Sequence, residues 1–287
     1  MSGWIEPGQA GLRRASAQTM VLPASATPRR WYQLNSPMAD WSGRRVWLVG
    51  ASSGIGLACA QALRAAGAQV VISARHAQSV QAWAAQDPGV QWCPLDVTHG
   101  PEVQAVAKAI VAGGPLHMVV YCAGYYKAQR ATALDLNQLL QHDQVNYQGA
   151  LQVLAAVLPT LLAQQQGHIS LISSVAGWSG LPNGLAYGPT KAAMTHLAET
   201  LYMDLQDQGI GVSVVHPGFV ATPLTAQNEF AMPALITPAK AAQEMLRGWA
   251  RGQFDIHFPR RFTLWLKLLK MLPYRLYFPL VRRFTGL

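Results

Sequence analysis

The sequence predicts a doubly wound α/β domain, in which helices cover both faces of a parallel β-sheet. Between Arg45 and Ala250, short apolar runs bounded by turns alternate with longer stretches of helical periodicity, which is the pattern of repeated β–α–β units. The chain is 51% apolar and 12% charged, and this composition suits strands that are buried on both faces. We therefore expect one domain over residues 43–257, with an extension over 1–42 and a tail over 258–287.

The individual elements follow from the local patterns. Short apolar runs predict strands over residues 46–49, 69–73, 90–95, 117–122, 169–173 and 211–215. Stretches of helical periodicity predict helices over residues 56–66, 101–111, 134–163, 187–206 and 238–250. This alternation implies parallel strands joined by crossover helices.

The net charge of +9 is concentrated at the two ends of the chain. Residues 1–45 hold six arginines against two acids, whereas residues 46–257 hold nine basic residues against eleven acids. Residues 258–287 hold seven basic residues and no acid. The nearly neutral body argues against a nucleic-acid-binding domain, so we expect no nucleic-acid partner. The basic ends indicate an attachment function in one or both of them.

Three cysteines, Cys59, Cys93 and Cys122, are widely spaced and lie outside any cluster of metal-ligating residues. An odd number with this spacing favours neither a disulfide framework nor a zinc site. We therefore predict buried free thiols, no bound metal and a reducing, cytoplasmic location.

The N-terminal segment shows neither helical nor strand periodicity over residues 1–37. It has no apolar run as long as the core of a signal peptide, although its Arg-rich, acid-poor composition is faintly similar to that of a transit peptide. Such a composition buries too little surface to fold, so we predict a disordered extension over residues 1–42. The alternative is that the working chain starts at Met38, just before the first strand.

A glycine-rich turn, Gly50-Ala51-Ser52-Ser53-Gly54-Ile55-Gly56, joins the first predicted strand to the first predicted helix. Glycines permit a tight turn and a close approach of the backbone to a pyrophosphate, and the free N–H groups of a helix start then hold the anion. Glycine clusters also mark ordinary turns. The position between a strand and a helix favours a dinucleotide site.

The second predicted strand ends in Ser73-Ala74-Arg75-His76, which contains no acid. A site for NAD usually places Asp or Glu here to accept a hydrogen bond from the adenosine 2′-hydroxyl, whereas Arg75 suits a 2′-phosphate. This predicts NADP(H), with a solvated surface arginine as the alternative. Asp96 and Val97, after the third strand, are expected beside the adenine, and a turn-forming role is the alternative for Asp96.

Tyr187 and Lys191 lie four residues apart at the start of a predicted helix and therefore on one face of it. A phenol with a pKa of about 10 is a poor acid or base at neutral pH. A neighbouring ammonium would favour the phenolate and so lower that pKa. Ser174, thirteen residues before Tyr187, follows a predicted strand, and its hydroxyl suits a substrate carbonyl whose oxygen gains charge.

Together these motifs resemble those of the short-chain dehydrogenase/reductase family, and the resemblance covers about residues 43–257. Asn146, in Val145-Asn146-Tyr147-Gln148-Gly149, matches the family's helix asparagine. His216-Pro217-Gly218-Phe219-Val220-Ala221-Thr222 matches the loop that packs on the nicotinamide. With the glycine-rich turn, the serine segment and the Tyr–Lys pair, five motifs occur in the family's order.

The resemblance implies a Rossmann fold and stereospecific hydride transfer between NADP(H) and a carbonyl or secondary alcohol. By this resemblance Tyr187 transfers the proton, Ser174 orients the oxygen and Lys191 binds the ribose and lowers the pKa of the tyrosine. Asn146 would hold a proton-relay water. The cofactor-binding residues that it implies are Gly50, Ser52, Ser53, Gly54, Ile55, Gly56, Arg75, Asp96, Val97, Ala123, Gly124, Tyr187, Lys191, Pro217, Gly218, Val220 and Thr222.

Two positions depart from the family's pattern. Val49 stands where the family usually has Thr, and Tyr121-Cys122-Ala123-Gly124 stands where it has Asn-Asn-Ala-Gly. In the family those polar side chains brace the sheet around the cofactor, so their loss puts local rigidity in doubt. We expect bulkier apolar packing to replace them.

The tail over residues 258–287 is unlike the body. Between Leu264 and Leu272 the Leu, Trp and Met side chains would form a broad apolar arc on a helix. Pro273 and Pro279 are expected to break this helix into pieces far shorter than the roughly 18 residues that cross a membrane. A basic helix of this kind is typical of a segment lying on an anionic membrane surface. Packing on the body or in a homo-oligomer is the alternative, and both can hold at once.

The leading functional prediction is a carbonyl reductase that uses NADPH on a hydrophobic or lipid-like small molecule, with peripheral contact to an anionic membrane. The alternative is a membrane-attached nucleotide-sensing or scaffold protein. The presence of both Tyr187 and Lys191 argues against this alternative. Substrate determinants are expected in residues 219–236 and 176–185, where apolar side chains predominate.

Overall fold

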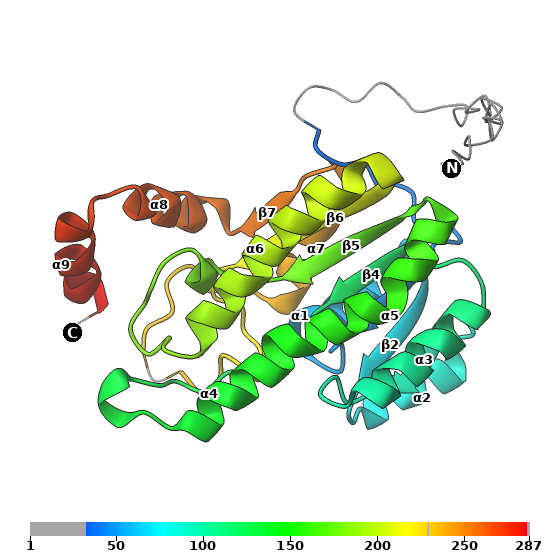
Figure 1. Ribbon diagram of the computed structural model, residues 1–287, viewed down its shortest axis with the longest axis horizontal. Helices are drawn as coiled ribbons and strands as arrows, with labels where there is room; N and C mark the ends of the chain where they lie inside the picture. Colours follow the sequence, from blue (N-terminus) through cyan, green and yellow to red (C-terminus); the bar gives the residue numbers. More distant parts are fainter. Residues whose placement is uncertain (1–32, 229, 286–287) are drawn as a thin grey trace, which may run out of the picture.

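The computed structural model describes residues 33–228 and 230–285. Its centre is a seven-stranded parallel sheet in the order β3-β2-β1-β4-β5-β6-β7, which confirms the predicted doubly wound fold (Figure 1). The strands are β1 (Arg45–Val49), β2 (Gln69–Ala74), β3 (Val90–Pro94), β4 (Met118–Tyr121), β5 (Gly167–Ile172), β6 (Ile210–Pro217) and β7 (Asp255–Phe258).

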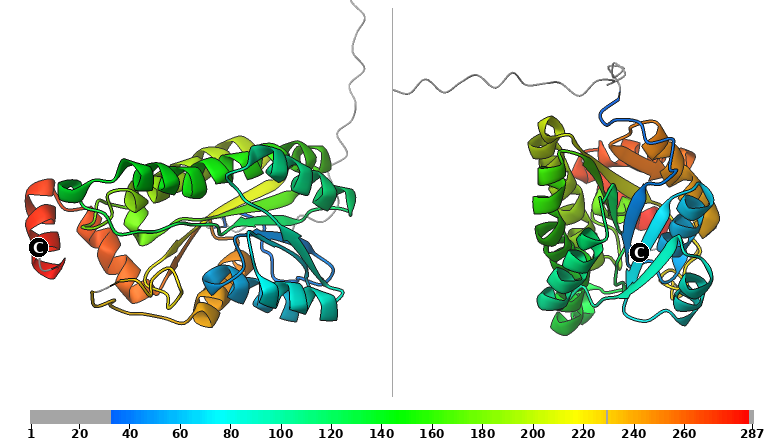
Figure 2. Two further views of the ribbon diagram at one scale, coloured as in Figure 1. Left: turned by 90° about the horizontal axis from the view of Figure 1, so that it is seen from below. Right: turned by 90° about the vertical axis from the view of Figure 1, so that its right-hand side faces the viewer.

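Helices cover both faces of the sheet and give the domain three layers (Figure 2). The helices on one face are α1 (Gly54–Ala65), α2 (Gln78–Gln86) and α7 (Pro238–Ala250). The helices on the other face are α3 (Gly100–Ala112), α5 (Gly149–Gln164) and α6 (Tyr187–Leu205). Three further helices, α4 (Leu136–Asp143), α8 (Arg260–Lys270) and α9 (Tyr274–Thr285), lie towards the carboxyl edge of the sheet (Figure 1).

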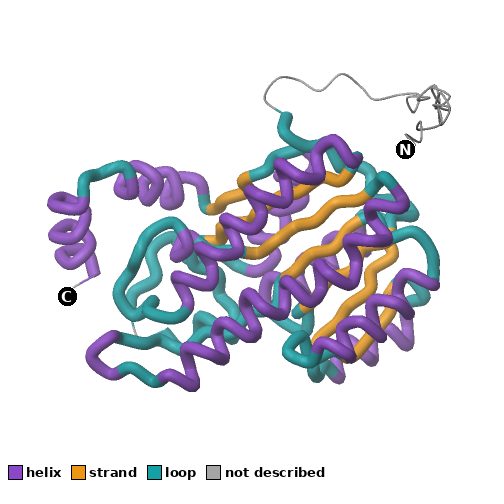
Figure 3. The backbone as a smooth tube through the Cα atoms, viewed as in Figure 1, coloured by secondary structure: helices purple, strands orange, loops and turns teal. Residues whose placement is uncertain are grey.

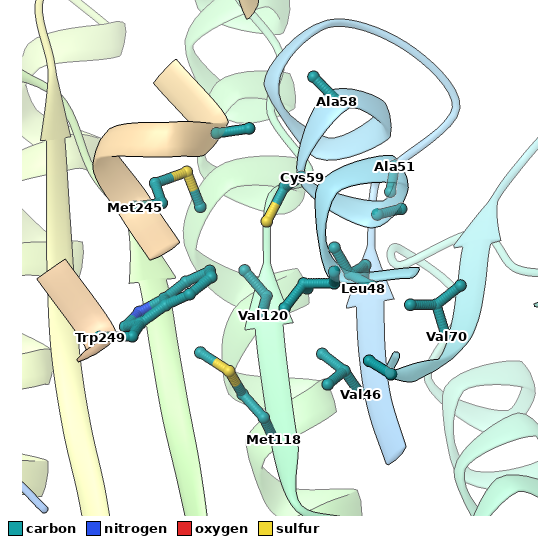
Figure 4. Close-up of a cluster of buried hydrophobic side chains, with 14 of the residues drawn as sticks. Val46, Leu48, Ala51, Ala58, Cys59, Val70, Met118, Val120, Met245 and Trp249 are labelled. Atoms are coloured by element: carbon teal, nitrogen blue, oxygen red, sulfur yellow. The ribbon is translucent and has the colours of Figure 1, made fainter. Parts of the chain in front are cut away.

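The alternation of side chains along each strand divides the core into two clusters. In β1, Val46 and Leu48 face α1 and α7, whereas Trp47 and Val49 face the other layer. Figure 4 shows the first cluster, in which Trp249 of α7 reaches over the sheet. Every residue of β1 is buried, as expected for a central strand covered on both faces.

The predicted long helix is present, and a π-helical turn over Gln144–Gln148 joins α4 to α5. The combined helix over Leu136–Gln164 has the length and hydropathy of a membrane span. However, Val153, Val157 and Leu161 are buried against the sheet, so this helix forms part of the domain core.

Two elements were not predicted, α2 and β7. Helix α2 buries only Val80, so its apolar periodicity is weak. Strand β7 has four residues, of which Ile256 and Phe258 are buried, too few for the alternation to stand out. Because β7 ends at Phe258, the predicted domain boundary after residue 257 falls inside a strand of the sheet.

The described part of the N-terminal extension, residues 33–42, packs on the domain, and there the prediction of disorder was wrong. Met38 and Trp41 are buried, and the Trp41 ring meets the Trp249 ring edge-on at 5.8 Å. The Asn35 side chain donates to the Val212 carbonyl at 2.8 Å and accepts from the Val212 N–H at 3.0 Å. The side-chain amide of Asn35 therefore pairs with the backbone of β6 in the way that a backbone amide of a neighbouring strand would. The remainder of the predicted extension lies outside the described residues.

The tail helices α8 and α9 project beyond the carboxyl edge of the sheet (Figure 3). Pro273 separates them as expected, but Pro279 lies inside α9, so the prediction that it breaks the helix was wrong. A proline removes one helical hydrogen bond, and the exposure of Pro279 and Arg275 lets water pair with the carbonyl that loses its partner. Tyr277 and Val281 are buried, so one side of the tail packs as the alternative interpretation expected.

We expect Asn35→Ala to lower the free energy of unfolding by about 1–3 kcal/mol, because it leaves the buried N–H and C=O of Val212 without partners. The matched control is Leu34→Ala, which trims an exposed neighbouring side chain and should change stability by less than about 0.5 kcal/mol. Denaturant unfolding followed by circular dichroism measures both. Equal midpoints for the two variants would contradict a structural role for residues 33–37.

Candidate active site

A cavity of about 360 Å³ opens at the carboxyl edge of the sheet, where β1 and β4 are neighbours. After β1 the chain passes to the face covered by α1, and after β4 it passes to the face covered by α5. Such a reversal leaves a crevice between the two strand ends, which is where ligands bind in open α/β sheets. Every residue predicted to bind the cofactor lines this cavity.

The glycine-rich turn brings the backbone of β1 against the end of β4. Gly50 has φ +84°, and a side chain there would overlap the backbone of Ala123. Ser53 occupies the N-cap of α1 but makes no capping hydrogen bond with its side chain. The first-turn residues Gly54 and Ile55 line the cavity, so the amino end of α1 suits a phosphate group. These features fit a dinucleotide.

Arg75 and Asp96 lie at the end of the cavity beside β2 and β3. Arg75 is exposed at the end of β2. Asp96 forms a turn, because its Oδ1 accepts from the Thr98 N–H at 2.9 Å and from the Thr98 hydroxyl at 2.8 Å. Burial opposes ionisation of Asp96, but these hydrogen bonds and the nearby Arg75 charge together lower its pKa. Asp96 therefore forms the turn that was the alternative role and also lines the cavity, whereas its place beside the adenine stays a prediction.

Tyr187, Ser174 and Lys191 meet at the other end of the cavity. Tyr187 and Lys191 lie in the first two turns of α6, with the Lys191 Nζ 5.5 Å from the centre of the Tyr187 ring. The Lys191 Nζ donates to the Ile172 carbonyl at 2.9 Å, and Ser174 follows the same strand, β5. The Ser174 hydroxyl completes the group, since it favours the ionised form of the Tyr187 phenol.

Burial sets the protonation states of this pair. It raises the pKa of Tyr187 to about 12, against the opposing effect of the Ser174 hydrogen bond. It lowers the pKa of Lys191 to about 8. The pKa of Tyr187 in the protein alone is therefore raised and not lowered as expected, because loss of solvation is the largest effect on it. At neutral pH the pair is therefore a phenol beside an ammonium.

Asn146 is the one predicted site residue that does not line the cavity. It is fully buried in the π-helical turn, where its Oδ1 accepts from the Tyr125 N–H at 2.6 Å. Its Nδ2 donates to the Tyr125 carbonyl and to the Thr190 hydroxyl, both at 3.0 Å. Asn146 thus ties the chain after β4 to the first turn of α6. A role in a proton relay stays a prediction.

At the positions that depart from the family's pattern, one new polar contact takes the place of those that were lost, and the sequence did not reveal it. Val49 is fully buried, in agreement with apolar packing. The Tyr121 side chain is buried too, but its hydroxyl donates to the Val145 carbonyl at 2.5 Å. A side chain on Gly149 would collide with this hydroxyl, so glycine is needed there. Tyr121 therefore braces the π-helical turn that holds Asn146.

A chain of polar contacts links the tail to the catalytic helix. The Lys267 Nζ of α8 contacts the Asp255 Oδ2 at 2.5 Å, and the Asp255 Oδ1 contacts the His216 Nδ1 at 2.8 Å. The His216 Nε2 contacts the Thr195 hydroxyl at 3.0 Å, which in turn donates to the Lys191 carbonyl at 3.1 Å. Burial opposes ionisation of Asp255, but His216 and Lys267 hold its pKa well below the usual range.

Sequence reasoning missed several residues around Tyr187. The Tyr126 ring meets the Tyr187 ring edge-on at 5.1 Å, and Tyr125 and Cys122 line the cavity. Their position after β4 is the signal that could have found them, because residues that follow a strand of a parallel sheet lie at the edge where ligands bind. Burial raises the pKa of the Cys122 thiol to about 12, which keeps it inert.

Comparison with known proteins identifies the family. A family model described as short chain dehydrogenase matches residues 44–232. An uncharacterized oxidoreductase of Myxococcus xanthus is 35% identical over 251 residues, covering 86% of this chain and 99% of that protein. An uncharacterized oxidoreductase of Staphylococcus epidermidis is 35% identical over 185 residues, covering 64% of this chain and 80% of that protein.

Solved structures share the fold. A short-chain dehydrogenase from Streptomyces avermitilis superimposes with a TM-score of 0.70 at 25% identity, covering 79% of this chain and 92% of that one. A short-chain dehydrogenase/reductase from Burkholderia phymatum in complex with NAD has a TM-score of 0.73 at 24% identity, covering 80% of this chain and 94% of that one. The protein therefore belongs to the short-chain dehydrogenase/reductase family of oxidoreductases, as its motifs indicated.

The lowered pKa of Lys191 predicts a pH-dependent stability. Between its folded pKa of about 8 and its ordinary value of 10.5, the unfolded state binds more protons than the folded state, so stability rises with pH. We expect the unfolding free energy of the wild type, relative to Lys191→Met, to increase by about 2 kcal/mol from about pH 8 to about pH 10. Denaturant titrations of both proteins across this range measure it. A constant difference would show that Lys191 is not desolvated.

Proposed function

We propose that this protein is an NADPH-dependent reductase that converts a carbonyl group of a hydrophobic or lipid-like small molecule into a secondary alcohol. The observation that carries the proposal is the buried phenol of Tyr187 beside Ser174 and Lys191 in a cavity that fits a dinucleotide. Burial raises the pKa of Tyr187 to about 12, so the side chain holds its proton at neutral pH and gives it up only to a more basic oxygen, such as the alkoxide that forms when a carbonyl is reduced.

A bound nicotinamide would supply the hydride, and the residues of the chain manage the proton and the charge. Tyr187 donates its proton to the carbonyl oxygen as negative charge develops there. The Ser174 Oγ accepts from the Ala176 N–H at 3.1 Å, which orients the hydroxyl, and its proton would turn from the Tyr187 phenol to the substrate oxygen. The Lys191 ammonium, close to the Tyr187 ring, then stabilises the phenolate that remains.

The preference for NADPH depends on Arg75. This arginine lines the cavity at the end of β2, where no acidic residue stands to accept from a ribose 2′-hydroxyl. A guanidinium there suits a 2′-phosphate through charge and geometry. Structures of similar fold hold NAD in one case and NADP in another, so Arg75 itself is the support for the choice.

The proposed substrate class follows from the side chains beyond Tyr187. Tyr126 and Leu224 border the reacting end of the cavity. Phe219 packs against Phe262 of α8, with ring centres 5.9 Å apart, and against Phe230 at 5.8 Å. This aromatic group lies next to Gly218 of the cavity lining and favours an apolar substrate.

We expect Tyr187→Phe to reduce the rate of carbonyl reduction by on the order of 10²–10⁴, because a positioned proton donor is lost while the ring is retained. NADPH binding, followed by fluorescence, should persist. Tyr202→Phe is the matched control, since it removes a phenol hydroxyl from the same helix at a half-buried site outside the cavity lining, where the hydroxyl donates to the Leu34 carbonyl. Its activity should be close to that of the wild type.

The substrate class is tested by measuring the consumption of NADPH in the presence of long-chain keto-lipids, steroids or short polar ketones. We expect turnover with the first two groups. Wild-type turnover that survives in Tyr187→Phe would overturn the mechanism, and turnover confined to polar ketones would overturn the substrate class.

We expect Arg75→Glu to shift the preference from NADPH toward NADH, because a carboxylate repels a 2′-phosphate and accepts from a 2′-hydroxyl. The KM for NADPH should rise by roughly tenfold or more, while that for NADH should fall. Arg251→Glu, an equal charge change at an exposed site outside the cavity, should leave both values unchanged. A wild type that already prefers NADH would contradict the role of Arg75.

A further inference from the structure

The two tail helices have one side that packs on the domain. Leu269, Tyr277 and Val281 are buried in a small cluster that includes Leu181 from the loop before α6. The Tyr277 hydroxyl donates to the Gly180 carbonyl at 2.8 Å. Together with the ion pair between α8 and β7, these contacts fix α8 and α9 on the body.

The tail also exposes many apolar side chains. Among the described residues, seventeen large apolar side chains are exposed, and eight of them lie between Leu264 and Phe284. Leu268 is 65% exposed and Met271 is 79% exposed. A cluster of this kind on one part of a protein marks an interaction surface. We call it the tail surface, and it consists of Leu264, Trp265, Leu268, Met271, Tyr274, Leu276, Phe278 and Phe284.

Positive charge surrounds these apolar side chains. The exposed basic residues of α8 and α9 are Arg260, Arg261, Lys270, Arg275, Arg282 and Arg283. Residues 258–287 contain no Asp or Glu. The seventh basic residue, Lys267, pairs with Asp255 of the body.

We propose that the tail surface docks on an anionic lipid membrane, with α8 and α9 lying in the interface. A surface that combines Leu, Met and aromatic side chains with Lys and Arg suits the boundary between acyl chains and anionic headgroups. Helices of 11 and 12 residues are too short to cross the bilayer, so the contact is peripheral.

Other occupants fit this surface less well. A symmetric contact between two copies would bring the same basic residues together and repel. Nucleic acid would match the charge but would leave the apolar side chains without a partner. An anionic lipid surface satisfies both chemistries.

Docking would also orient the active site. Strand β7 ends at the carboxyl edge of the sheet, and α8 begins two residues later, so the tail and the cavity share one end of the molecule (Figures 1 and 2). Phe262 of α8 contacts Gly218 of the cavity lining. A docked protein would therefore hold this end close to the lipid.

The test measures co-sedimentation of the full chain, without cofactor or substrate, with vesicles of phosphatidylcholine alone or with about one third phosphatidylglycerol. We expect binding to the anionic vesicles to exceed that to the neutral ones on the order of a hundredfold at low salt. High salt should remove most of this difference but leave the part due to apolar insertion. Because no turnover is measured, the result does not depend on the proposed enzymatic function.

Two variants separate the apolar and the charged contributions. Leu264→Ser/Leu268→Ser lies on one face of α8 and should weaken binding by about tenfold or more at every salt concentration. Lys270→Gln/Arg275→Gln/Arg283→Gln should weaken it on the order of a hundredfold at low salt only. The control Leu162→Ser/Met203→Ser changes side chains that are 41% and 63% exposed elsewhere, and it should bind as the wild type does.

Melting temperature and oligomeric state are measured for every protein. Unchanged melting temperatures with the expected losses of binding would support the proposal. Background sedimentation of the full chain with anionic vesicles at low salt would overturn it. It would also be overturned if Leu264→Ser/Leu268→Ser dissociated an oligomer and left vesicle binding unchanged, since a second copy would then cover the tail surface.

Discussion

The reversal of the chain between β1 and β4 is the constraint on which the rest of this structure depends. The chain leaves these neighbouring strands towards opposite faces of the sheet, so no helix closes the space between their carboxyl ends. Close approach at Gly50 and Ala123 keeps this crevice narrow at the point where a pyrophosphate fits. The cofactor cavity and the catalytic group are both consequences of that one topological feature.

Burial within the crevice determines the chemistry of the catalytic pair. Removing Lys191 and Tyr187 from water favours the neutral form of each, so the lysine releases its proton more readily and the phenol holds its proton more tightly. The buried ammonium is kept in place by the Ile172 carbonyl. Polar contacts through Thr195, His216 and Asp255 extend this support to the tail. The same low polarity that strengthens these contacts makes each of them costly to lose.

The tail is joined to this arrangement through Lys267, which neutralises Asp255. Its helices bury Leu269, Tyr277 and Val281 against the body, and their exposed residues are both apolar and cationic. A helix confined to domain packing would place polar residues outside. The composition of these exposed residues is the reason for assigning the tail a lipid partner.

The sequence alone determined six of the seven strands, the glycine-rich turn and the Ser174–Tyr187–Lys191 spacing, because periodicity and short motifs act over a few neighbouring residues. It could not determine that Asn35 extends the edge of β6, that Tyr121 braces the turn around Asn146, or that Lys267 reaches Asp255. These contacts join residues distant in sequence, and the pKa of Tyr187 likewise depends on burial by several elements. Only the tertiary structure decided them, since desolvation and long-range pairing exist only once the chain is packed.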